Sequence, residues 1–128
     1  MGMDYRYAGS ASYSRFDREL CAVAEVFDGI KTKHLKEREQ TENERPLGYW
    51  FGFLSSDGSN EPKFVFPEGT NETLIKWFNN PYSENFTVKE TVVIWEQISA
   101  HPEIEEISWQ IWHEFEWLIA YGDRWLIA

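Results

Sequence analysis

A tetrapeptide is repeated near the C-terminus: Trp-Leu-Ile-Ala occurs at residues 117–120 and again at 125–128, separated by Tyr-Gly-Asp-Arg. If Gly122 and Asp123 form a two-residue turn, the tryptophan of each copy pairs with the alanine of the other, so each large ring faces a methyl group. The leucines and isoleucines then pair across the hairpin and make both of its faces apolar. Such a hairpin needs cover on both sides, and the repeat therefore predicts a core β-hairpin over about 107–128.

The same region also fits a helix. Apolar residues recur there at helical spacing: Ile104, Ile107, Ile111, Phe115 and Leu118. Pro102 suits a first helical turn and Gly122 suits a helix end. A strand from residue 107 to 121 would exceed the usual strand length and would need a bulge near His113. We favour strands because of the repeated tetrapeptide, and a helix over 103–121 remains the alternative.

Three further helical patterns precede this region. The first predicts an amphipathic helix that begins after a Ser14 cap, ends near Gly29, and buries Phe16, Leu20, Val23, Phe27 and Ile30. The second is a short stretch after Thr70, stopped by Pro81, in which Leu74, Trp77 and Phe78 share a face. The third predicts a helix over about 88–100, which starts with a capping box at Thr87 and Glu90 and buries Val88, Val92, Trp95 and Ile98 or their neighbours.

A first hairpin is predicted over about 48–66, where two aromatic and β-branched runs flank a loop rich in Ser, Asp, Gly and Asn. A chain of 128 residues can bury one sizeable core. Its 17% aromatic content excludes a disordered chain, because such side chains bury enough apolar surface to offset the ordering entropy. We therefore expect a single α+β domain spanning 1–128, in which a small antiparallel sheet of two hairpins packs with the N-terminal amphipathic helix and a second helix near 88–100.

Motifs that would indicate catalysis or a cofactor are missing from the sequence. Cys21 is the single cysteine, and a small buried side chain is its expected role. His34, His101 and His113 do not have the spacing of a zinc site, and no phosphate-binding loop or nucleophile elbow occurs. We expect no enzyme activity, no metal and no cofactor.

The charge is uneven. Residues 41–128 contain five basic and fifteen acidic groups, which accounts for the whole net charge of −10. Such a chain repels nucleic acid and anionic membranes, and it attracts basic proteins. The sequence has no apolar run of membrane-spanning length and no signal peptide pattern, so we expect a cytoplasmic protein.

On the strand interpretation, one tryptophan would point outward among carboxylates. The predicted partner-binding residues are Glu103, Glu105, Glu106, Trp112, Glu114 and Glu116. An aromatic anchor with an acidic rim is typical of a surface that binds basic proteins. We therefore expect a small inhibitor that occludes a basic toxin, nuclease or nucleic-acid-binding protein, by analogy with immunity proteins and phage anti-defence inhibitors. The alternatives are a small-molecule-binding domain or minor enzyme with an aromatic pocket, and a structural subunit of a larger complex.

Overall fold

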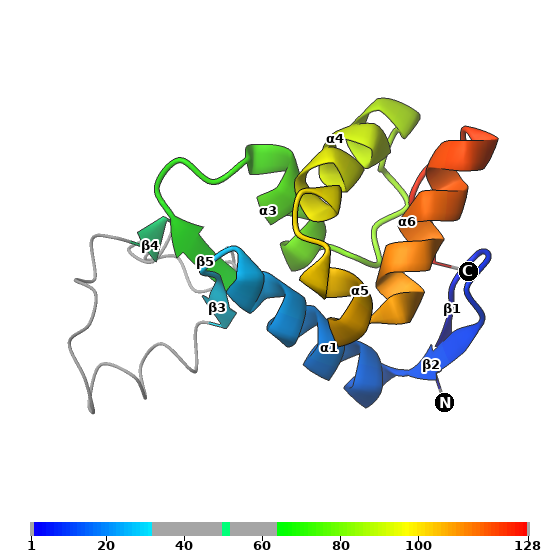
Figure 1. Ribbon diagram of the computed structural model, residues 1–128, viewed down its shortest axis with the longest axis horizontal. Coiled ribbons are helices and arrows are strands. Elements are labelled where there is room, and N and C mark those ends of the chain that lie inside the picture. Colours follow the sequence, from blue (N-terminus) through cyan, green and yellow to red (C-terminus); the bar gives the residue numbers. More distant parts are fainter. Residues whose placement is uncertain (1, 32–49, 52–63, 128) are drawn as a thin grey trace.

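The computed structural model describes residues 2–31, 50–51 and 64–127 (Figure 1). Within these ranges the chain forms five helices and two small antiparallel sheets. The predicted α+β class is therefore confirmed. No helix among the described residues has the length and apolar character needed to cross a membrane.

The N-terminal residues form a hairpin that leads into the first helix. Strand β1 (Gly2–Asp4) pairs with β2 (Ser10–Ser12), and α1 (Tyr13–Val26) follows directly. Phe16, Leu20 and Val23 of the predicted apolar stripe are buried on α1, and Phe27 is the half-buried C-cap. The N-cap is Ser12, whose hydroxyl accepts from the Arg15 amide. Ser14 is therefore not the cap, because the helix begins earlier than predicted. Ile30 lies beyond the helix, in a strand.

The second sheet has β5 at its centre. Strand β5 (Phe64–Pro67) pairs with β3 (Ile30–Lys31) on one side and with β4 (Trp50–Phe51) on the other, both antiparallel. The β4 and β5 pairing agrees with the hairpin predicted over 48–66, and the connection between these strands lies outside the described residues. Gly29 is required where the chain enters β3, because a Cβ there would lie 2.2 Å from the Phe66 ring.

Helices α3 (Glu72–Asn79) and α4 (Val88–Ser99) form where the sequence predicts them. Asn71, not Thr70, caps α3, and the predicted apolar face of α3 is buried. The capping box at the start of α4 is confirmed, with both of its hydrogen bonds present. The buried face of α4 is rotated from the one predicted: Thr91 and Ile94 are inside, whereas Val88 and Val92 are exposed.

The hairpin predicted over 107–128 is wrong. The region instead forms α5 (Glu103–Ile107) and α6 (Trp109–Tyr121), which Figure 1 shows beside α4 and the β1–β2 hairpin. The hydroxyl of Ser108 caps α6, and Gly122 ends it with a left-handed backbone at φ 69°. The helical conformation is favoured over the strand because it buries one continuous apolar face and forms its backbone hydrogen bonds within the helix itself.

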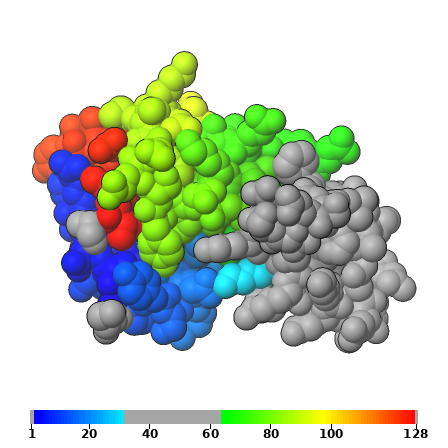
Figure 2. All heavy atoms as spheres, turned by 180° about the vertical axis from the view of Figure 1, so that it is seen from behind, coloured from blue at the N-terminus to red at the C-terminus, as the bar shows by residue number. Residues whose placement is uncertain are grey.

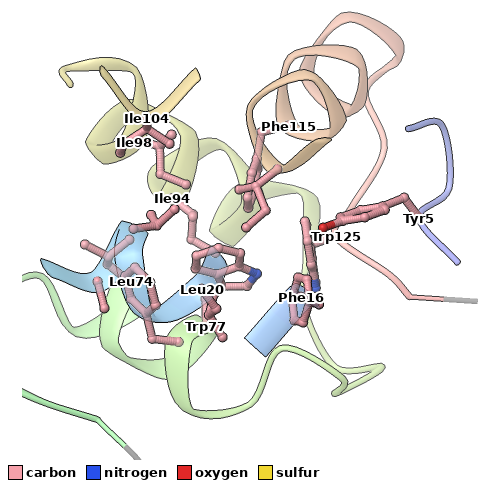
Figure 3. Close-up of a cluster of buried hydrophobic side chains, with 14 of the residues drawn as sticks. Tyr5, Phe16, Leu20, Leu74, Trp77, Ile94, Ile98, Ile104, Phe115 and Trp125 are labelled. Carbon is pink, nitrogen blue, oxygen red and sulfur yellow. The ribbon is translucent and has the colours of Figure 1, made fainter. Parts of the chain in front are cut away.

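The chain after Gly122 returns to the core instead of forming a second strand. Its Trp125 is fully buried and lies 4.8 Å from the Phe115 ring and 5.2 Å from the Trp77 ring, centroid to centroid (Figure 3). Seen from behind, the red C-terminal residues lie between the blue N-terminal hairpin and the yellow-green residues that lead into α4 (Figure 2). The last residues therefore join both ends of the described chain in one core.

Candidate interaction surface on α5 and α6

Four of the predicted partner-binding carboxylates lie at the surface. Glu103, Glu105 and Glu106 are exposed on α5, and Glu116 is exposed on α6. Helix α5 packs against α6, and the break at Ser108 lets α5 pack against both α1 and α6. The structure brings Glu105 and Glu116 together, because both carboxylates contact the ring of His113.

Glu114 does not belong to this surface. It is fully buried, and its carboxylate accepts hydrogen bonds from the backbone amides of Arg6, Tyr7 and Ala8, at 2.8 to 3.0 Å. Burial raises the pKa of Glu114, and the three amide hydrogen bonds oppose that rise. Glu114 therefore fastens the tip of the N-terminal hairpin to α6. Its position on the buried side follows from the helical period, since it lies three residues after Ile111.

Trp112 is not the outward anchor that the strand interpretation predicts. Its side chain is half-buried and packs edge to face on Trp95 of α4, with ring centroids 4.9 Å apart. The helical geometry of α6 turns Trp112 toward its neighbour helix. It helps to join α4 to α6.

The sequence interpretation missed a row of exposed rings along α6. Trp109, Trp117 and Tyr121 have exposed fractions of 51%, 42% and 69%. With His113 they follow one another at intervals of four residues, which places them along one side of a helix. We call these four residues the aromatic ladder. Their spacing was visible in the sequence, but a strand of period two hides it.

The aromatic ladder is supported from the N-terminal hairpin. The Tyr7 ring stacks on Tyr121 at 5.2 Å and meets Trp117 edge to face at 6.3 Å. The Tyr7 hydroxyl donates to Asp123, which also pairs with Arg6 at 3.5 Å. The hairpin that Glu114 fastens to α6 therefore also completes the exposed aromatic surface.

An imidazole occupies the middle of the aromatic ladder, between two carboxylates. Nε2 of His113 lies 3.0 Å from Glu105 Oε2, and Nδ1 lies 2.8 Å from Glu116 Oε1. The ring centroids of Trp109 and Trp117 lie 6.4 and 6.3 Å from that of His113. Two carboxylates and two indoles thus surround one flat ring.

Two other kinds of site, a metal site and an aromatic pocket for a small molecule, were sought among the residues that the structure describes. No group of three or more His, Cys, Asp and Glu side chains there could hold a metal ion. A hollow beside β1 and β2 does not match the aromatic pocket of the small-molecule alternative, because no aromatic residue lines it; its lining residues are Gly2, Met3, Asp4, Ser10, Ala11, Ser12 and Arg15.

Comparison with known proteins adds no further assignment. No protein-family model, curated protein or solved structure matches this chain significantly.

Proposed function

We propose that this protein binds a basic protein partner and neutralises it by covering a basic, functional surface of that partner. The observation that carries the proposal is the exposed aromatic ladder with carboxylates on either side of its central imidazole. Tryptophan and tyrosine anchors contribute much of the binding energy at protein interfaces, and surrounding charges select the partner.

The charge of the chain supports the same proposal. A net charge of −10 accelerates encounters with a basic protein and disfavours nucleic acid and anionic membranes as direct ligands. Within the proposal, the partner is a toxin, a nuclease or another nucleic-acid-binding protein whose cationic cleft the surface covers. Such an inhibitor needs no catalytic group of its own, and we place it in the cytoplasm together with its target.

The proposal is tested by affinity capture from a lysate of the native host, with identification of the retained proteins at low and moderately raised salt. Wild type is compared with a variant in which four exposed carboxylates are neutralised: Glu103→Gln, Glu105→Gln, Glu106→Gln and Glu116→Gln. A control variant removes the same number of charges at exposed glutamates on other elements: Glu25→Gln, Glu68→Gln, Glu72→Gln and Glu84→Gln.

The expected result is a basic protein that wild type and the control variant retain and the four-residue surface variant releases. The captured protein is then assayed for its own activity with and without the inhibitor, which should abolish it. If both variants retain the partner equally weakly, the loss reflects net charge and not the surface of α5 and α6. A captured partner with no basic surface would refute the proposal.

A further inference from the structure

We propose that the aromatic ladder recognises arginine in an extended segment of its partner, with guanidinium groups stacked on Trp109 and Trp117 and hydrogen-bonded to Glu105 and Glu116. This inference rests on the proposed function and specifies its chemistry. It follows from the flat ring that the carboxylates already contact, from the spacing of the indoles, and from the support that the N-terminal hairpin gives to one end of the aromatic ladder.

The surface is built around a flat ring that bears two nitrogens. The His113 ring lies between two carboxylates, at 3.0 and 2.8 Å, and between two indoles. A guanidinium is also flat, and it is charged and able to donate to two carboxylates from different edges. An arginine that stacks on either indole therefore brings its guanidinium next to the ring that both carboxylates contact.

Arginine fits this chemistry better than lysine does. A guanidinium stacks on an aromatic face and is weakly hydrated, whereas an ammonium is a compact and strongly hydrated charge. The chain shows the contact next to the aromatic ladder, where the guanidinium carbon of Arg6 lies 5.8 Å from the centre of the Tyr7 ring. The surface should therefore distinguish the two cations and not respond to positive charge alone.

The spacing of the indoles defines the segment that fits. Trp109 and Trp117 are eight residues apart on α6, which corresponds to about 12 Å along the helix axis. In an extended segment four residues span about 13 Å, and side chains at i and i+4 point to the same side. Two arginines separated by three other residues can therefore reach both indoles at once.

The hairpin supports one end of the aromatic ladder before a partner binds. Three backbone amides of the hairpin tip bond to Glu114, Gln110 donates to the Ala8 and Ser10 carbonyls, and Tyr7 packs on Tyr121 and Trp117. Preorganised contacts lower the ordering cost of binding. Trp117 can thus stack on a guanidinium without rearrangement of the hairpin.

The test is calorimetric titration of the full chain with three peptides at low salt. The first is Gly-Arg-Ser-Gly-Ser-Arg-Gly, the second replaces both arginines by lysine, and the third places the arginines three positions apart. We expect the first peptide to bind at least about 5-fold more tightly than the lysine peptide, and more tightly than the third. Equal affinities for arginine and lysine peptides, or no binding by any peptide, would overturn the inference.

Matched variants locate the binding. Trp109→Ala and Trp117→Ala should each weaken the first peptide at least about 5-fold, because each removes one stacking surface. Tyr13→Ala removes a ring that is 50% exposed on α1 and should leave the affinity unchanged. Thermal unfolding of each variant checks that the fold is intact. An equal loss in the Tyr13 variant would contradict a site on α6.

Failure of this inference can be separated from failure of the proposed function. If a basic protein is captured through the surface carboxylates but the chain does not prefer arginine peptides, only the arginine inference is refuted. If the chain prefers arginine peptides through both indoles but captures no basic protein, the inhibitor proposal is refuted and a guanidinium-binding surface remains.

Discussion

The two copies of Trp-Leu-Ile-Ala have the same sequence, but their tryptophans have opposite environments. In the first, Trp117 belongs to α6 and is 42% exposed; in the second, Trp125 follows the helix and is fully buried. The indole of Trp125 donates to the Pro81 carbonyl at 2.7 Å, and its backbone amide donates to Thr91 Oγ1 at 2.8 Å. Trp117 contributes to a surface, and Trp125 contributes to the core.

The difference comes from the residues around each copy. In α6 the helical period directs Leu118 inward, and Trp117, one residue earlier, then points outward. Gly122 ends the helix and releases the chain, so that the next tryptophan can enter the space between Trp77, Phe115 and Tyr5. A repeated tetrapeptide is therefore not evidence of a repeated conformation.

Truncating the two tryptophans should give the largest contrast in stability. Trp125→Ala removes a buried ring whose indole N–H donates to the Pro81 carbonyl, and it should lower the free energy of unfolding by about 3–5 kcal/mol. Trp117→Ala removes an exposed ring and should change it by less than about 1 kcal/mol. Urea denaturation measures both, with Trp125→Phe as an intermediate variant that keeps a ring but loses the indole donor. Comparable losses in the two alanine variants would show that Trp117 also supports the core.

A second contrast compares carboxylates on the same helix. Glu114→Ala leaves three amides of the hairpin tip without their acceptor, and we expect a loss of about 3 kcal/mol in the free energy of unfolding. Glu116→Ala removes an exposed contact to His113 and should cost less than about 1 kcal/mol. Hydrogen exchange at residues 6–8 gives an independent measurement, since only the first substitution should expose these amides. Unchanged exchange there would mean that other contacts hold the hairpin.

Signals between residues close in sequence predicted two of the helices correctly. The capping box at Thr87 and the apolar stripe that begins at Phe16 both identify their helices. The α+β class follows from these helices together with the pairing of β4 and β5. The capping box and each step of the apolar stripe join residues within about one turn of one another.

The candidate surface was predicted only in part, because its geometry depends on the choice between two periods. Period two places Trp112 and Glu114 outward, whereas period 3.6 places Glu114 inside and Trp109 and Trp117 outside. The exposed carboxylates on α5 were predicted because charged side chains are rarely buried, and Glu114 is the exception to that rule. The length of the stretch, too long for a typical strand, was the signal that favoured the helix.

The turn between the two copies can be tested through Gly122. Its φ of 69° is left-handed, and a Cβ added there would meet no atom within 4 Å. Gly122→Ala should therefore cost about 1–2 kcal/mol in the free energy of unfolding, from backbone conformation alone. Gly122→Asn should cost less, because asparagine tolerates this conformation. If the asparagine variant is as unstable as the alanine variant, the cost is not conformational.

The smallest expected effect is a pH dependence from Glu114. Burial raises its pKa above that of the unfolded chain, despite the opposing amide hydrogen bonds, so the folded protein binds the proton more tightly. This contribution to stability is fully present below the unfolded pKa and is lost as the pH rises through the folded pKa. Acidification from neutral pH towards 4.5, the ordinary value for this group, should therefore stabilise wild type relative to Glu114→Gln. Urea denaturation of both proteins at each pH gives the difference between their free energies of unfolding, in which the contributions of the other titrating groups cancel. If the free energy of unfolding of wild type instead falls relative to that of the variant on acidification, the three amide hydrogen bonds outweigh burial and the folded protein binds the carboxylate more tightly than its protonated form.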